Sequence, residues 1–118
     1  MTLGEVKDII HGTVLTGEDA LGNDIDGAFA SDLMSDVLAF VTDNALLITG
    51  LINSHVIRTA EMLDVPCIIF SRGKQPSQEM LEMAEEIGVT VLTTKMTSYQ
   101  ISGELYAHGL SATRTKDT

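Results

Sequence analysis

Three short polar segments of the sequence carry the residue types best suited to binding an anion. Residues 49–54, 71–77 and 93–98 contain three of the seven Lys and Arg residues (Arg72, Lys74 and Lys95) and no Asp or Glu. They also contain hydroxyl groups and glycines, and each leads into a predicted helix whose free N–H groups attract negative charge. On a chain with a net charge of −10, these segments predict a site for an anionic small molecule such as a nucleotide phosphate. The candidate ligand-binding residues are Thr49, Gly50, Asn53, Ser54, Ser71, Arg72, Gly73, Lys74, Thr93, Thr94 and Thr97.

A plainer interpretation of the same residues stays open. Hydroxyl side chains cap helices, glycines allow turns, and Lys and Arg keep loops soluble, all without any ligand.

The second half of the chain must position these segments, and its pattern is regular. Residues 45–48 and 65–70 are apolar runs of strand length, and residues 89–92 (Val-Thr-Val-Leu) are the last strand candidate; each is followed by a polar segment and a predicted helix. Strands that are apolar at every position lie in parallel sheets covered by helices on both faces. Right-handed crossovers place every strand-to-helix loop at one edge of such a sheet, where ligands of open α/β folds bind.

The first half of the chain contains the remaining predicted helices and strands, whose sequence patterns are weaker. Thr2 and Glu5 form a capping-box pattern at the start of a helix that ends near residues 11–12. Residues 13–15 and 25–30 are strand candidates, and the helical pattern over residues 33–41 has Ser31 or Asp32 as its expected cap.

Composition and charge exclude several classes of protein. A hydrophobic content of 44% and a charged content of 20% are typical of a globular domain. The acidic net charge argues against binding nucleic acid or an anionic membrane surface. No apolar run approaches the roughly 20 residues that span a bilayer, and the first ten residues do not resemble a signal peptide. With Cys67 as the single cysteine, we expect a cytoplasmic protein without a disulfide.

The sequence contains fragments of catalytic and metal-binding motifs, but their residues do not have the spacing that those motifs require. Gly73 and Lys74 look like the end of a P-loop, but Ile68 stands where its first glycine belongs and Gln75 where Ser or Thr belongs. The three histidines show no metal-ligand spacing with one another or with Cys67, which we interpret as a core residue. We therefore expect no catalytic residue, no metal, no cofactor and no enzyme activity.

Three aromatic side chains each keep more than one interpretation. His55, at the start of a predicted helix, is either a partly exposed first-turn residue or a hydrogen-bond donor to a ligand or partner. Tyr99 and Tyr106, on the last predicted helix, either stack on a base, close a dimer interface, or pack as ordinary amphipathic rings.

The stretch from residue 43 to residue 110 resembles the DRTGG domain family. The resemblance lies in ALLITG, in VPCIIFSRGKQPSQEMLEMAEEIGVTVLTT and in KMTSYQISGEL, although the five-residue sequence that names the family is absent. The chain is also similar to the amino-terminal domain of HPr kinase/phosphorylase, whose catalytic P-loop domain has no counterpart here. The resemblance implies a three-layer α/β/α sandwich with a mostly parallel sheet of about four to five strands. It also implies a regulatory module that pairs with itself, in a family whose members accompany adenine-nucleotide-binding domains.

These observations together predict one DRTGG-like domain over residues 1–110 and a flexible tail over residues 111–118. We expect a homodimeric, non-catalytic regulatory domain that senses an adenine nucleotide at the carboxyl ends of the strands. The alternative is an adaptor that docks on a partner enzyme or signalling protein without a small ligand.

Overall fold

Five strands alternate with helices along the computed structural model, which describes residues 1–41 and 44–112. In chain order the elements are α1 (Leu3–Ile9), β1 (Thr13–Thr16), the short 3₁₀ helix η1 (Glu18–Ala20), β2 (Gly27–Ala30), α2 (Met34–Phe40), β3 (Ala45–Thr49), α3 (Ser54–Met62), β4 (Cys67–Phe70), α4 (Gln78–Ile87), β5 (Thr90–Thr93) and α5 (Ser98–Ala107).

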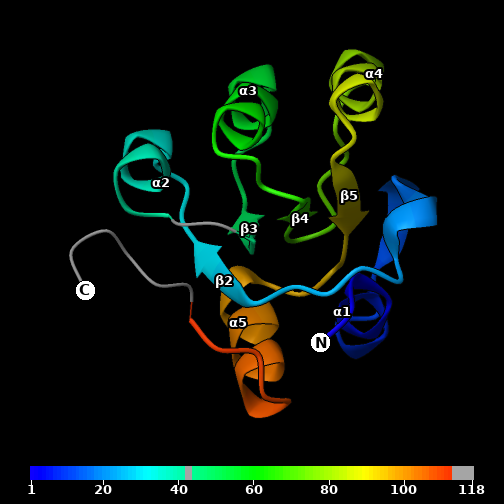
Figure 1. Cartoon of the computed structure of the whole chain (residues 1–118), viewed down its shortest axis with the longest axis vertical. Helices are drawn as coiled ribbons and strands as arrows, with labels where there is room; N and C mark the ends of the chain where they lie inside the picture. The colour runs from blue at the N-terminus through cyan, green and yellow to red at the C-terminus, as the bar shows by residue number, and fades with distance from the viewer. Residues whose placement is uncertain (42–43, 113–118) are drawn as a thin grey trace.

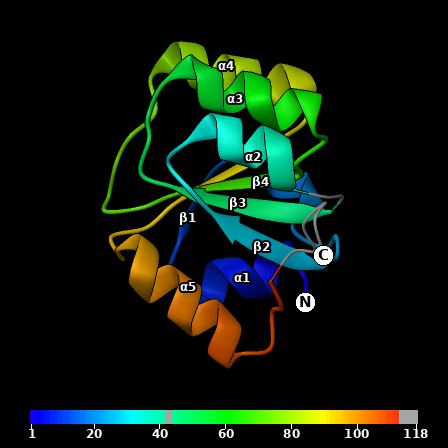
Figure 2. The same ribbon diagram turned by 90° about the vertical axis from the view of Figure 1, so that its left-hand side faces the viewer.

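The strands form one mixed sheet in the order β1-β5-β4-β3-β2. Neighbours from β2 to β5 pair in parallel, and only β1 runs antiparallel, against β5. Each strand from β3 to β5 is added on the same side of the strand before it. Right-handed crossovers therefore put α2, α3 and α4 on one face of the sheet (Figure 1). Helices α1 and α5 cover the opposite face, so the fold is the predicted three-layer α/β sandwich (Figure 2).

Each face of the sheet has its own hydrophobic core, and the central strands contribute side chains to both. In β4, Ile68 and Phe70 pack toward α2, α3 and α4, whereas Cys67 and Ile69 pack toward α1 and α5. All residues of β3, β4 and β5 are buried. This two-sided burial is the physical reason that β4 is apolar at every position and that β3 and β5 are apolar except at their threonines.

Side-chain caps set most of the helix starts. The Thr2–Glu5 capping box is present at α1, and Ser77 accepts a hydrogen bond from the backbone N–H of Met80 at α4. The cap expected for α2 is wrong: its N-cap is Leu33, with no side-chain cap hydrogen bond. Ser31 accepts only from the Leu33 N–H, and the Asp32 carboxylate bonds elsewhere.

The predicted tail begins where the chain meets β2. The backbone N–H of Ala28 donates to the carbonyl oxygen of Ser111 at 3.2 Å, and Ala112 forms an isolated parallel bridge with Ala28. The rest of that tail, residues 113–118, lies outside the described residues.

Candidate functional site

The three predicted segments meet at the carboxyl edge of the sheet, and backbone hydrogen bonds join them. The Ser71 N–H donates to the carbonyl oxygen of Thr49 at 3.1 Å, which ties the loop after β4 to the end of β3. The Gly73 N–H donates to the carbonyl oxygen of Thr94 at 2.7 Å, which ties the same loop to the one after β5. The loop after β4 is therefore the centre of this edge.

A fourth segment, which the sequence analysis did not place here, brings a carboxylate to the edge. Asp32 follows β2, and its Oδ1 accepts hydrogen bonds from the Thr49 hydroxyl at 3.0 Å and from the Gly50 N–H at 2.7 Å. The Gly50 bond is the main cause that lowers the pKa of Asp32, with help from the Thr49 hydroxyl and from the positive charges of Arg72 and Lys74. The parallel pairing of β2 with β3 brings Asp32 here, because it sends the loops that follow both strands to one edge of the sheet.

Arg72 lies against the start of the β3–α3 loop in a constrained turn. A Cβ atom on Gly50 would stand 3.0 Å from Nη2 of Arg72 and 3.3 Å from Oγ of Ser71, so a larger residue there would require these side chains to move by a few tenths of an ångström. Arg72 and Gly73 both have positive φ angles (58° and 67°), and the Lys74 N–H closes the turn on the Ser71 carbonyl oxygen at 3.3 Å. The left-handed conformation costs a non-glycine residue such as Arg72 about 1 kcal/mol.

Most of the predicted threonine hydroxyls donate inside the protein. The Thr93 hydroxyl donates to the carbonyl oxygen of Lys74 at 2.9 Å, and the Thr94 hydroxyl donates to that of Ile10 at 2.7 Å. Both threonines are buried. These bonds hold the loops in place, and the side chains of Arg72 and Lys95 stay exposed at this edge.

The remaining predicted residues form the first turns of α3 and α5. Asn53 caps α3 by accepting from the His55 N–H, and Ser54 is the first residue of that helix. Thr97 and Gln100 form a capping box at α5. His55 is exposed, and its side chain has no hydrogen-bond partner among the described residues.

A cavity of about 490 Å³ opens at one end of this edge. The antiparallel strand β1 begins here, opposite the end of β5, and therefore brings in the α1–β1 connection with His11, which the sequence analysis missed. Three of the predicted residues line this cavity, namely Gly73, Thr93 and Thr94. The other lining residues are Ile10, His11, Thr13, Gln75, Lys95 and Met96.

The other predicted residues do not line this cavity. Thr49, Gly50, Ser71 and Arg72 gather around Asp32 instead. Asn53, Ser54 and Thr97 stay at their helix starts, and Lys74 contributes its carbonyl oxygen to Thr93. The carboxyl edge therefore has two parts, the Asp32–Arg72 cluster and the His11–Lys95 cavity.

Groups suited to covalent or metal chemistry are not gathered at this edge. Cys67 is fully buried in β4, and burial raises the pKa of its thiol to about 12, so the thiol stays protonated. Among residues 1–41 and 44–112 no three His, Cys, Asp or Glu side chains are placed to hold a metal ion. Over the same residues no helix has the length and hydropathy that crossing a bilayer requires.

Comparisons with known proteins place the chain in a family. The DRTGG domain model matches residues 5–107. The fold is similar to the crystal structure of the CBS and DRTGG domains of the regulatory region of Clostridium perfringens pyrophosphatase, complexed with the activator diadenosine tetraphosphate, with a TM-score of 0.72 and 20% sequence identity. The match covers 88% of this chain and 45% of that one, so this chain spans less than half the length of its structural relative. No curated protein matches it.

Proposed function

The chain belongs to the DRTGG domain family, and from that premise we propose that it is a non-catalytic regulatory domain that binds an adenine nucleotide at the carboxyl edge of its sheet. The observation that carries this proposal is the cavity bounded by His11 and Lys95, which joins apolar and cationic groups at the edge where α/β folds bind ligands.

The cavity has the size and the lining that a nucleotide requires. Its 490 Å³ lies within the range of about 300–1,000 Å³ that is typical of small-molecule sites. Met96 and the imidazole of His11, which are at least partly exposed, offer surfaces on which a base can pack. The ammonium group of Lys95, with Arg72 nearby on the same edge, offers positive charge to a phosphate on an otherwise acidic chain.

The similar pyrophosphatase structure supports this proposal at the level of the family. That regulatory region contains a DRTGG domain and is complexed with an adenine dinucleotide activator. The shared fold makes an adenine nucleotide the first ligand to test here.

Calorimetric titration with AMP, ADP, ATP and diadenosine tetraphosphate tests the proposal. We expect at least one of them to bind with a Kd below about 1 mM, which corresponds to about −4 kcal/mol. Lys95→Ala should weaken that binding at least fivefold, because it removes the cation that lines the cavity. Lys7→Ala, which removes a half-buried lysine on α1 that does not line the cavity, should leave it within twofold.

A null result has a clear meaning. If none of the four nucleotides binds, or if both lysine variants weaken binding equally, the cavity is not an adenine nucleotide site.

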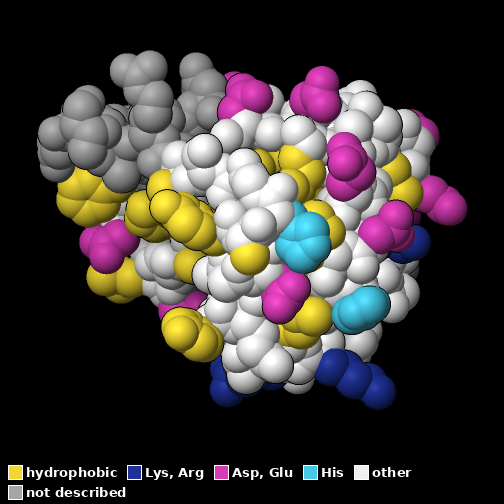
Figure 3. All heavy atoms as spheres, turned by 90° about the horizontal axis from the view of Figure 1, so that it is seen from below, with side chains coloured by type: hydrophobic (Ala, Val, Ile, Leu, Met, Phe, Trp, Pro, Cys, Tyr) yellow, Lys and Arg dark blue, Asp and Glu magenta, His cyan; other side chains and the backbone are white. Residues whose placement is uncertain are grey.

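A second candidate function, an adaptor that docks on a partner enzyme or signalling protein, is favoured by one observation. Tyr99 and Tyr106 are 88% and 73% exposed, and their spacing of seven residues places both on one side of α5. Figure 3 views the molecule from the side of α1 and α5, and hydrophobic side chains stand exposed on the left of this face. Recovery of a stoichiometric protein partner without bound nucleotide would favour the adaptor over the sensor.

A further inference from the structure

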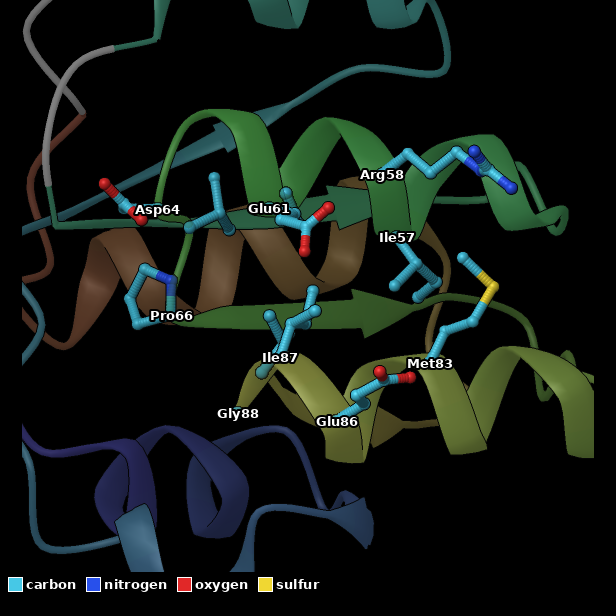
Figure 4. A pocket seen from close by; sticks show the side chains of 12 residues that line it. Ile57, Arg58, Glu61, Asp64, Pro66, Met83, Glu86, Ile87 and Gly88 are labelled. Atoms are coloured by element: carbon cyan, nitrogen blue, oxygen red, sulfur yellow. The ribbon is translucent and has the colours of Figure 1, made fainter.

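A groove of about 590 Å³ lies between α3 and α4, at the opposite edge of the sheet from the candidate nucleotide site. The last turns of both helices form its walls, and the residues that lead into β4 and β5 close its end (Figure 4). None of the residues singled out at the carboxyl edge lines this groove.

The floor of the groove is apolar and only partly covered. Ile57 and Val65 are buried, whereas Met83, Ile87 and Pro66 keep part of their surface accessible. When another apolar group covers such partly exposed side chains, the complex is stabilised by about 25 cal/mol per Å² of apolar surface that leaves water.

The rim of the groove is acidic, and its charges are not paired. Glu61, Asp64 and Glu86 line it, and none of these carboxylates has an ion-pair or hydrogen-bond partner among the described residues. Arg58 is the one cation in the lining, and Figure 4 shows its guanidinium extending toward the opposite end of the groove from Asp64 and Pro66.

The helix ends add to this negative charge. Neither α3 nor α4 has a basic residue in its last turn, where the unpaired carbonyl groups carry about half a negative charge. Acidic side chains at such positions disfavour the helix, yet Glu61 lies in the last turn of α3 and Glu86 in that of α4. A cation bound in the groove would offset both the carboxylates and the two helix ends.

We propose that this groove is a docking site for a partner protein, which it binds through an amphipathic segment bearing Lys or Arg beside apolar side chains. The apolar floor and the acidic rim are complementary to the two kinds of side chain on such a segment. A small cation would use only the rim, and an uncharged apolar ligand only the floor. This proposal goes beyond nucleotide binding and does not depend on it, because the two sites lie at opposite edges of the sheet.

The test uses the full chain and a synthetic peptide as the probe. The peptide has about 14 residues, or about four helical turns, with leucines on one face and lysines beside them. A second peptide has the same composition in an order that is not amphipathic. We expect saturable binding of the first peptide with a micromolar Kd, with amide NMR shifts in the last turns of α3 and α4. Binding of the second peptide should be at least tenfold weaker.

Matched variants separate a groove from general charge attraction. Glu61→Gln, Asp64→Asn and Glu86→Gln together should raise the Kd at least tenfold. The control Glu18→Gln, Asp19→Asn and Glu104→Gln changes the net charge equally, at exposed residues that do not line the groove, and should change the Kd less than twofold. Nucleotide titrations of both variants should match the original chain, so failure of one site is distinguishable from failure of the other.

Any of the following outcomes would overturn the proposal. Equal weakening by both triple variants would show attraction by net charge only. Absence of binding, or shifts confined to other elements, would show that the groove takes no such segment. Concentration-dependent shifts of the same amides without peptide would assign the groove to a second copy of the chain. Displacement of the peptide by millimolar Ca²⁺ or Mg²⁺ at constant ionic strength would assign it to a metal ion.

Discussion

Asp32 makes side-chain hydrogen bonds that link two loops at the carboxyl edge of the sheet. Its carboxylate satisfies the hydroxyl of the fully buried Thr49 and the N–H of Gly50, and it stands close to Arg72. A buried donor left without its acceptor costs about 1–3 kcal/mol. Asp32 therefore acts first as a structural residue that joins the loops after β2 and β3.

Replacing Asp32 should destabilise the protein in a pH-dependent way. We expect Asp32→Ala to lower the free energy of unfolding at pH 7 by about 1–3 kcal/mol, measured by urea denaturation. Asp19→Ala, at an exposed residue of η1, should change it by less than about 0.5 kcal/mol.

The direction of the pH dependence follows from the lowered pKa of Asp32. A carboxylate with a lowered folded-state pKa contributes stability above its unfolded pKa of about 3.9 and loses it as the pH falls through the folded value. The difference between Asp32→Ala and the original chain should therefore be constant from about pH 8 to 5 and shrink below about pH 4. A difference that grows on acidification would contradict the role assigned to this carboxylate.

At the scale of elements, one glycine at the end of α4 and another inside α5 show how backbone conformation limits which residue a position accepts. Gly88 ends α4 with a φ of 80°, and nothing lies within 4 Å of the Cβ that a larger residue would add. Gly103 lies inside α5, also with open space around such a Cβ. Backbone conformation alone therefore decides what alanine does at each position.

The two glycines should respond to alanine with opposite signs. Gly88→Ala should destabilise the protein by about 1 kcal/mol, because the left-handed region is unfavourable for alanine. Gly103→Ala should stabilise it by about 0.5–1 kcal/mol, because alanine is the better helix former. Urea denaturation at one low protein concentration measures both without a contribution from self-association. Changes of the same sign would show that something other than backbone conformation dominates.

At the scale of the whole molecule, charge and exposed apolar surface act against each other in self-association. The net charge of −10 makes two copies repel, whereas Tyr99 and Tyr106 offer apolar surface on α5 that contact with a second copy would bury. Salt screens the repulsion over about 10 Å at 0.1 M and leaves the apolar contribution in place.

We therefore expect a homodimer that tightens with salt. Sedimentation equilibrium at micromolar concentration should show a dimer whose dissociation constant falls as NaCl rises from about 50 to 300 mM. Tyr99→Ser with Tyr106→Ser should give a monomer, and Leu33→Ser, at an exposed residue on the other face of the sheet, should not. A monomer in the original chain at every salt concentration would remove the dimer.

The sequence by itself determined the architecture and the family. A run such as β4 is apolar at consecutive positions because two-sided burial requires it, and the Thr2–Glu5 capping box is a local interaction that a few neighbouring residues reveal. The DRTGG resemblance is confirmed by the match over residues 5–107, while the similarity to HPr kinase/phosphorylase stays a prediction.

Only the tertiary structure decided what the carboxyl edge consists of. Asp32 reaches Gly50 through the parallel pairing of β2 with β3, and His11 reaches the cavity with Lys95 through the antiparallel pairing of β1 with β5. Both pairings join segments far apart in the chain, and the side-chain pattern of a short strand does not say which neighbour it will choose. The Thr2–Glu5 capping box depends on nearby residues and could be recognised in the sequence, whereas the site depends on strand order, which is a property of the assembled sheet.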